Sequence, residues 1–239
     1  MVFDLYFLRN ITPLGKKMVR RLNQKIALMI HALFPLNDTI KILEIGPGVG
    51  TFADVFHATS KKQIVYYGID PNSSLCKLGE EKGYHFINAS VPPFPDNQDM
   101  KEFDCVYLSH VLEHFVSYPV VVDVVAGISS LLKQKGYMVI MVPDYLDWKE
   151  DFFNGDYTHS YVTTERRLRE LVKDMDFEIV DVRHYRACYT FPQTLLVYPF
   201  HAIIKMFAGV LYNFFGSLDI LFKIKVTFAR NILIVCKKK

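Results

Sequence analysis

The stretch Ile42-Leu-Glu-Ile-Gly-Pro-Gly-Val-Gly-Thr51 decides the fold of this chain. It is a short apolar run with one carboxylate near its end, followed by glycines at alternate positions and by a segment with helical spacing. Only glycine lets the backbone approach a ligand closely and adopt a positive φ there. In a doubly wound sheet, the first turn from strand to helix lies at the carboxyl edge, where ligands bind. The stretch therefore predicts a ligand-binding turn over residues 46–50.

Further short apolar runs alternate with stretches of helical spacing along the chain. The predicted strands are Ile40–Ile45, Ile64–Ile69, Tyr84–Ile87, Asp104–Leu108, Tyr137–Val142, Phe177–Val182 and Asn231–Cys236. The predicted helices of the core are Thr51–Ala58, Ser73–Glu81, Pro119–Leu132 and Thr164–Met175. Strands that alternate with helices pair in parallel through crossover connections. We therefore expect an α/β fold with a doubly wound, seven-stranded, mostly parallel sheet.

One large domain with additions is the organisation that length and composition favour. The chain has 239 residues, of which 51% are hydrophobic and 22% are charged, close to globular averages. Apolar residues recur at three- and four-residue steps from Pro13 to Phe34, with lysines and arginines between them, so an amphipathic helix precedes the core. We divide the chain into an N-terminal helical cap (1–38), a core (39–184), an apolar insertion (185–230) and a last strand with a basic tail (231–239).

Charge and cysteine content argue against several classes of protein. A net charge of +3 is too small to indicate nucleic-acid binding. The four cysteines form no C-x-x-C pair, which fits neither a zinc knuckle nor a disulfide-rich secreted domain. The N-terminus lacks the basic, apolar and small-residue order of a signal peptide. We therefore expect a cytoplasmic protein with reduced thiols and no nucleic-acid partner.

The spacing of the glycines distinguishes two classes of nucleotide ligand. A dinucleotide-binding turn requires G-x-G-x-x-G, which places a pyrophosphate on the helix N-terminus. Here Thr51 stands three residues beyond Gly48, and the third glycine comes one residue earlier, at Gly50. This spacing favours S-adenosylmethionine (SAM), which has no pyrophosphate. A nicotinamide-dependent oxidoreductase and a glycine turn that binds nothing are the alternatives.

Polar residues at the ends of the next two predicted strands extend the nucleotide site. Asp70 ends the second strand twenty residues after Gly50, and the geometry of adjacent strands would direct its carboxylate to two ribose hydroxyls. Asp70-Pro71 is also a common turn dipeptide, so Asp70 indicates a ribose site only in combination with the glycine turn. The third strand ends in Asn88-Ala89-Ser90.

These motifs together resemble the class I SAM-dependent methyltransferases. The glycine turn is similar to motif I of that family, and residues 103–115 resemble the motif that follows strand four in its small-molecule members. Residues 131–143 resemble their helix, turn and fifth strand, and the resemblance extends from about Lys41 to Val182. It implies a Rossmann-like fold whose seventh strand runs antiparallel beside the sixth, and methyl transfer from SAM.

The resemblance also implies roles for individual residues. Glu44 would hold the amino end of the methionine moiety through water or backbone. Asn88 stands where the family usually has an acid that accepts from the adenine amino group, and an amide oxygen can accept that bond too. The residues expected to bind SAM are Glu44, Gly46, Pro47, Gly48, Gly50, Asp70, Pro71, Asn88, Ala89, Ser90 and Ser109.

Two histidines are candidates for the catalytic general base that a hydroxyl acceptor requires. His110 follows the fourth strand at the SAM edge, and His159 lies in the loop after the fifth strand. In the structural alternative, His110 packs against SAM and His159 caps the helix that begins near Thr163.

A divalent-metal site is a second interpretation of the same region. His110, Glu113 and His114 have the spacing i, i+3 and i+4, which would place all three on one face of a helix, and His159 would complete the site. A Glu-His pair at this place is also a frequent feature of metal-free relatives. We therefore assign no metal from the sequence.

The segment between the predicted sixth and seventh strands is unusually apolar. Residues 187–204 include no Asp, Glu, Lys or Arg, and residues 206–218 are likewise uncharged. Prolines and polar residues at Pro192, Gln193, Pro199 and Lys205 interrupt the run, so we expect no membrane crossing.

As a single helix over Leu196–Lys223, this insertion would carry one narrow polar stripe and a wide apolar arc. The stripe would consist of His201, Lys205, Asp219 and Lys223. The arc requires a cover, either within the chain, from a second copy in a homodimer, or at the inner membrane surface through residues 190–225. The terminal lysines 237–239 favour the membrane.

We therefore expect a SAM-dependent methyltransferase that O-methylates a small or lipid- or sugar-type acceptor. The aromatic loop Asp144–Tyr157 is expected to form part of the mouth of its acceptor pocket. A catalytically weak, SAM-binding scaffold near a membrane is the alternative, to which Asn88 and the long insertion point.

Overall fold

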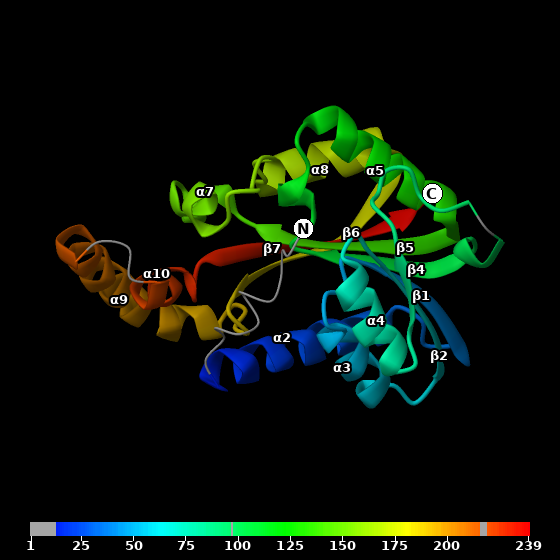
Figure 1. Ribbon diagram of the computed structural model, residues 1–239, viewed down its shortest axis with the longest axis horizontal. Coiled ribbons are helices and arrows are strands. Elements are labelled where there is room, and N and C mark those ends of the chain that lie inside the picture. Colours follow the sequence, from blue (N-terminus) through cyan, green and yellow to red (C-terminus); the bar gives the residue numbers. More distant parts are fainter. Residues whose placement is uncertain (1–12, 97, 216–218) are drawn as a thin grey trace.

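A seven-stranded sheet with the strand order β3-β2-β1-β4-β5-β7-β6 forms the centre of the computed structural model (Figure 1). The structure describes residues 13–96, 98–215 and 219–239, so residues 1–12 of the predicted cap and 216–218 of the predicted insertion lie outside the described residues. The strands are β1 (Thr39–Ile45), β2 (Gln63–Asp70), β3 (His85–Asn88), β4 (Phe103–Ser109), β5 (Leu132–Pro143), β6 (Phe177–Arg186) and β7 (Arg230–Lys238). All seven predicted strands are therefore present.

The strand directions are those expected from the resemblance to class I SAM-dependent methyltransferases. β1 pairs in parallel with β2 and β4, β2 with β3, and β4 with β5. β7 lies between β5 and β6 and runs antiparallel to both. The carboxyl ends of β1 to β5 and the beginning of β7 consequently meet at one edge of the sheet.

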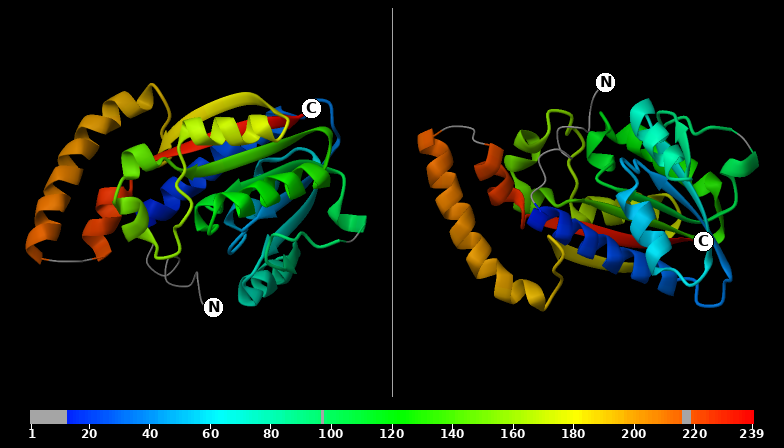
Figure 2. Two further views of the ribbon diagram at one scale, coloured as in Figure 1. Left: turned by 90° about the horizontal axis from the view of Figure 1, so that it is seen from above. Right: turned by 60° about the horizontal axis from the view of Figure 1, so that its bottom comes forward.

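Helices cover both faces of the sheet (Figures 1 and 2). One face carries α2 (Pro13–Ala32), α3 (Thr51–Thr59) and α4 (Ser73–Glu81), and the other carries α5 (Tyr118–Leu131) and α8 (Glu165–Asp174). The short helices η1 (Gln98–Met100), η2 (Leu112–His114), α6 (Tyr145–Trp148) and α7 (Asp151–Gly155) belong to the connections. The doubly wound arrangement is thus confirmed.

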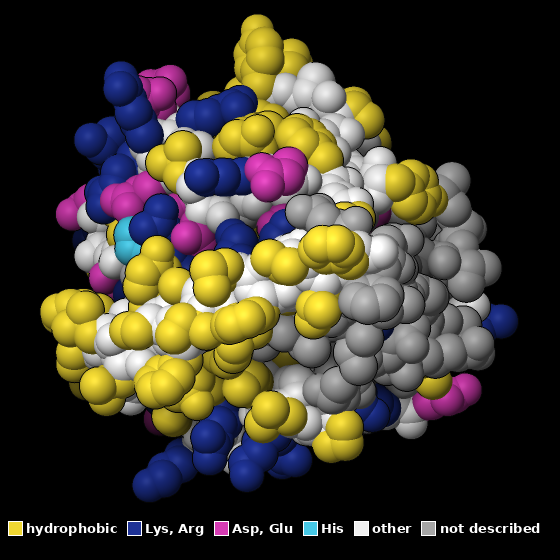
Figure 3. All heavy atoms as spheres, turned by 90° about the vertical axis from the view of Figure 1, so that its left-hand side faces the viewer, with side chains coloured by type: hydrophobic (Ala, Val, Ile, Leu, Met, Phe, Trp, Pro, Cys, Tyr) yellow, Lys and Arg dark blue, Asp and Glu magenta, His cyan; other side chains and the backbone are white. Residues whose placement is uncertain are grey.

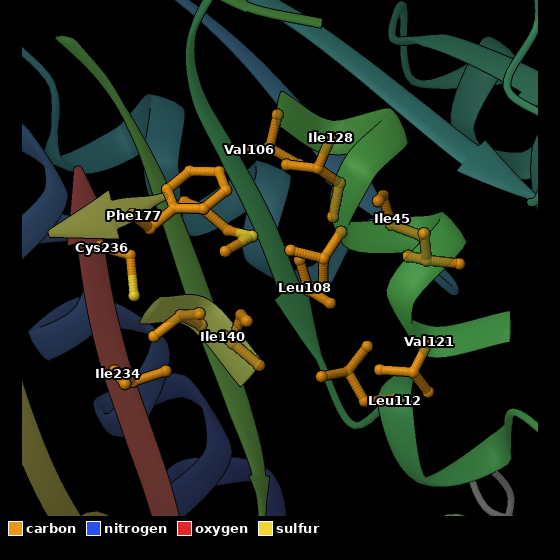
Figure 4. Packing of buried hydrophobic residues seen from close by; sticks show 14 of the residues in the cluster. Ile45, Val106, Leu108, Leu112, Val121, Ile128, Ile140, Phe177, Ile234 and Cys236 are labelled. Carbon is orange, nitrogen blue, oxygen red and sulfur yellow. The ribbon is translucent and has the colours of Figure 1, made fainter. Parts of the chain in front are cut away.

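Two apolar layers hold these helices on the sheet. On the α5 side, Ile45, Leu108 and Ile140 of three neighbouring strands pack with Val121 and Ile128 of the helix (Figure 4). The opposite layer joins α2 and α3 to the sheet through Ile26, Ile30, Phe52, Phe56, Tyr107 and Val139. Because β4 lies at the middle of the sheet, residues 103–108 are all buried, which explains the continuous apolar run over 105–108.

The apolar insertion forms two helices, α9 (Gln193–Phe215) and α10 (Asp219–Val226), which pack against each other. The described residues of the insertion thus differ from the single helix over Leu196–Lys223 for which the polar stripe is considered. Pro199 and Lys205 interrupt the apolar run of the sequence but not the helix, since α9 continues through both residues. A proline removes only one hydrogen bond of the helix, and the flanking residues preserve the others.

The polar side chains of α9 turn toward the body of the protein. His201 is 2% exposed and its Nε2 lies 3.3 Å from the carbonyl oxygen of Lys225. Lys205 Nζ donates to the carbonyl oxygen of Asp147 at 3.2 Å. These two members of the predicted stripe thus share one face, and that face is the inner one.

Replacing a central side chain tests how far the sheet depends on its apolar layers. Leu108→Ala leaves a cavity between β4 and α5, and we expect it to lower the free energy of unfolding by about 2–5 kcal/mol in urea denaturation. Leu36→Ala is the control, because Leu36 is 93% exposed, and its effect should stay within about 0.5 kcal/mol. Equal losses in both variants would contradict the assigned core.

Candidate active site

The glycine turn after β1 has the backbone geometry that its sequence predicts. Gly46, Gly48 and Gly50 have φ values of +72°, +53° and +75°, and Gly50 is the residue that caps α3. A Cβ on Gly46 would lie 2.8 Å from Val111, whereas a Cβ on Gly48 would have no atom within 4 Å. The turn is thus strained for any other residue, and open space lies above Gly48 for a ligand.

Asp70 connects the glycine turn with the loop after β2. Its Oδ2 accepts a hydrogen bond from the Gly48 amide at 3.3 Å, and its Oδ1 accepts from the Asn72 amide at 2.9 Å. Its carbonyl oxygen accepts from Asn88 Nδ2 at 3.1 Å and from the Ala89 amide at 3.2 Å. The ends of β1, β2 and β3 are therefore held together around one residue, and the contact of Asn88 with adenine stays a prediction.

Glu44 is buried beneath the turn, next to Tyr66, whose hydroxyl donates to its carboxylate. Burial raises the pKa of Glu44 to about 8, and the negative charge of Asp70 adds to the rise. An ammonium group at this place would favour the ionised carboxylate, as the predicted methionine amino group would. Sequence reasoning missed Tyr66, although the parallel register of Glu44 with Gly68 places it on the same face two residues away.

The other residues expected to bind SAM lie at the same carboxyl edge. Pro47 is buried beside Gly68, where an added Cβ would lie 2.8 Å from its ring. Pro71, Ala89 and Ser90 follow β2 and β3, and Ser109 is the half-buried last residue of β4. The structure thus brings the predicted cofactor residues together, and their contacts with SAM stay a prediction.

His110 follows Ser109 in the left-handed region, with a φ of +56°. Its Nδ1 lies 3.0 Å from Oε1 of Glu113, a side chain with no exposed surface, while the imidazole itself is about half exposed. The His110 amide donates to the carbonyl oxygen of Met141 at 2.8 Å, which fixes the residue between the ends of β4 and β5. A buried carboxylate therefore orients the ring, and Nε2 is available at the edge.

His159 contacts His114 rather than the other predicted catalytic histidine. The two imidazole rings have centroids 4.9 Å apart, and Glu113 belongs to the same cluster. Burial lowers the pKa of the His114 imidazole. The suggestion that His159 caps the following helix is wrong, because the side chain of Thr164 caps α8 by accepting from the Arg167 amide.

The helical face proposed for His110, Glu113 and His114 does not form. Only Leu112–His114 are helical, in the single 3₁₀ turn η2, and the left-handed backbone of His110 precedes it. An α-helical periodicity consequently does not apply, and His110 reaches Glu113 through the turn geometry instead.

The aromatic loop after β5 folds into α6 and α7 beside this histidine cluster. Phe152 is buried against Tyr145 and His159, whereas Phe153 and Tyr157 are exposed. Asp147 makes two hydrogen bonds of 2.8 and 2.9 Å with the guanidinium of Arg186, which ties the loop to β6. The loop is therefore tied to the rest of the fold through β6, and its place at the mouth of an acceptor pocket stays a prediction.

Comparison with known proteins leads to the same assignment as the geometry of the site. A family model described as a methyltransferase domain matches residues 18–182, which are more than half of the chain. The chain belongs to this methyltransferase family. It is a SAM-dependent enzyme, and the nicotinamide alternative is set aside.

Solved structures with the same fold include several methyltransferases. A SAM-dependent methyltransferase from Archaeoglobus fulgidus is 18% identical, with a TM-score of 0.59 over 98% of this chain and 100% of the other. A putative sarcosine dimethylglycine methyltransferase from Galdieria sulphuraria is 14% identical, with a TM-score of 0.64 over 92% and 86%. Magnesium protoporphyrin IX methyltransferase from Synechocystis, solved with bound SAM, is 13% identical, with a TM-score of 0.59 over 99% and 92%. No curated protein matched the sequence.

Substitutions at two glycines that both have a positive φ test the cofactor site of the methyltransferase. Gly48→Val places a side chain in the open space above the turn, and we expect SAM binding to weaken at least about 100-fold by isothermal titration calorimetry. Gly83→Val is the matched control, because Gly83 also has a positive φ and no atom within 4 Å of an added Cβ. Both variants should fold by circular dichroism, and equal SAM affinity in the two would remove the assignment.

Proposed function

We propose that the methyltransferase transfers the methyl group of SAM to a hydroxyl oxygen of a small acceptor, with His110 as the general base. The observation that supports this most directly is the contact between His110 and the buried Glu113 at the edge that carries the glycine turn. A carboxylate that accepts the Nδ1 proton fixes the tautomer and leaves the Nε2 lone pair for catalysis.

Bound SAM supplies an electrophilic methyl group on a sulfonium. The residues of this chain have to position the two reactants and accept one proton. As the new carbon–oxygen bond forms and the carbon–sulfur bond breaks, the acceptor hydroxyl gives its proton to His110 Nε2. The resulting imidazolium is stabilised by Glu113, and the other product is S-adenosylhomocysteine.

Replacing His110 separates proton transfer from cofactor binding. His110→Asn keeps a residue that tolerates the left-handed backbone but removes the base, and we expect kcat to fall by about 10²- to 10⁴-fold. SAM affinity should change by less than about threefold. The assay measures S-adenosylhomocysteine formed with a panel of phenols, isoprenoid alcohols and sugars, each paired with its fully O-methylated derivative as a control without a free hydroxyl.

His85→Ala is the control variant, because His85 is exposed on β3 and packs on Tyr67 outside the proposed base. Turnover of amines but of no hydroxyl acceptor would contradict O-methylation. SAM binding without turnover of any acceptor would favour the catalytically weak scaffold.

An apolar acceptor is supported by the position and surface of α9. Residues Gln193–Tyr212 are long and apolar enough to cross a membrane, with a mean hydropathy of 1.6, and only 11% of them are buried. The α9–α10 pair projects from the end of the sheet at which β7 begins, which is the edge of the glycine turn (Figures 1 and 2). A membrane at α9 would therefore lie on the side from which an acceptor enters.

The contacts of α9 favour a helix that lies on a membrane over one that crosses it. A crossing helix would have to expose His201 and Lys205 to lipid and lose their bonds to Lys225 and Asp147. The outward side chains are instead apolar, with Leu195, Leu196, Phe200, Ile203, Met206, Phe207, Val210 and Phe214 all exposed. A polar face held by the protein and an apolar face turned outward suit burial in the interface of a bilayer.

Positive charge lies close to the exposed apolar face of α9. Lys25 of α2 donates to the carbonyl oxygen of Cys188 at 2.7 Å and to Gln193 Oε1 at 3.2 Å, which places α2 beside the start of α9. The exposed basic residues of α2 are Lys16, Lys17, Arg20 and Arg21. Figure 3 shows the hydrophobic band with Lys and Arg side chains along its border. We therefore propose peripheral binding to anionic lipid at the cytoplasmic surface of the inner membrane.

Flotation with liposomes tests the proposed membrane surface. The chain should float with vesicles that contain phosphatidylglycerol and much less with pure phosphatidylcholine. Phe200→Asp and Phe207→Asp together should reduce flotation at least about fivefold, because two charges enter the apolar face. Leu36→Asp together with Leu78→Asp is the control, since this pair adds the same two charges at exposed leucines outside α9. A wild-type chain that stays unbound but elutes as a dimer would assign α9 to a homodimer interface.

A further inference from the structure

We infer that Glu113, His114 and His159 form a binding site for one divalent transition-metal ion. One carboxylate oxygen and one nitrogen from each imidazole lie within 4.8 Å of one another. Two imidazoles with one carboxylate are the ligand set of several catalytic zinc sites and of non-haem iron sites. The inference goes beyond the proposed methyl transfer, although the site shares Glu113 with the proposed base His110.

Both imidazoles have the tautomer that metal binding requires. His159 Nδ1 lies 2.5 Å from the carbonyl oxygen of Phe152, which can only accept, so Nδ1 carries the proton. His114 Nδ1 lies 2.7 Å from Thr158 Oγ1, and that hydroxyl uses its own proton toward Asp156 Oδ1 at 2.6 Å. His114 Nδ1 must therefore donate as well, and each ring keeps a lone pair on Nε2. A carbonyl or carboxylate partner behind a histidine is typical of metal ligands.

The carboxylate of Glu113 has one oxygen that the described part of the protein leaves without a partner. Oε1 pairs with His110 Nδ1, whereas Oε2 has no hydrogen bond and no exposed surface. Burying an unpaired carboxylate oxygen costs free energy unless a cation or donor compensates for it. An ion between Oε2 and the two imidazoles would supply that compensation without displacing His110.

The loops that carry the three residues are already joined. The carbonyl oxygen of Glu113 accepts from the amides of Ser160 and Tyr161 at 2.8 and 3.1 Å, so η2 and the loop before α8 move together. Ligand atoms around a tetrahedral zinc lie about 3.4 Å apart, so small side-chain rotations would close the site. Three protein ligands leave at least one position open, and an oxygen ligand could occupy it.

Metal titration of the untagged chain, after dialysis against EDTA, tests the site. Zn²⁺ should bind with a stoichiometry of one by isothermal titration calorimetry, and Co²⁺ should produce visible absorption bands of a low-coordinate site. Zn²⁺ should also raise the melting temperature. His114→Ala and His159→Ala should each raise the dissociation constant for Zn²⁺ at least about 100-fold.

His85→Ala is the control and should bind Zn²⁺ like the wild type, since His85 is exposed and belongs to no such cluster. Circular dichroism without metal establishes that each variant folds. Glu113→Gln keeps the size of the side chain and removes its charge, so it should weaken binding without the loss of volume. Two results would overturn the inference. The wild type could bind Zn²⁺ with a Kd above about 100 μM, or the histidine variants could bind Zn²⁺ as well as the control does.

Discussion

Parallel pairing of β1 with β2 is the constraint on which the site depends, because it brings the glycine turn and Asp70 to the same edge. With Glu44 in register with Gly68, both strands end together, and the carboxylate of Asp70 reaches the amide of Gly48. A slip of one residue would turn Asp70 to the opposite face of the sheet. The two apolar layers that fix this register therefore also fix the position of the glycine turn relative to Asp70.

The second half of the site depends on connections that return to this edge from elsewhere in the chain. Met141 of β5 holds the amide of His110, and the loop before α8 bonds to the carbonyl oxygen of Glu113. The two halves differ in character, since the first is built around a backbone turn shaped by glycine and the second around histidine side chains that contact the buried Glu113. A displacement reaction needs a protein that places the methyl donor rigidly and supports the reactive group separately.

The nucleotide half could be predicted from the sequence because its signals are local. Glycines at 46, 48 and 50 and an acid at the end of the next strand need only the order of the elements to be interpreted. The contact between His110 and Glu113 depends on a left-handed residue, which hydrophobic periodicity does not record. The pairing of His114 with His159 depends on a return over 45 residues, which no local pattern of the sequence records.

The reversed direction of β7 determines where the end of this chain emerges. The strand begins at the edge of the glycine turn and leads away from it, so Lys238 pairs with Phe177 at the opposite edge (Figure 1). Nine residues at about 3.3 Å each separate the two edges by roughly 30 Å. A fluorescent reporter or an immobilisation linker joined after Lys239 would thus lie far from the glycine turn, and tethering through that position would direct the edge with the turn away from the support.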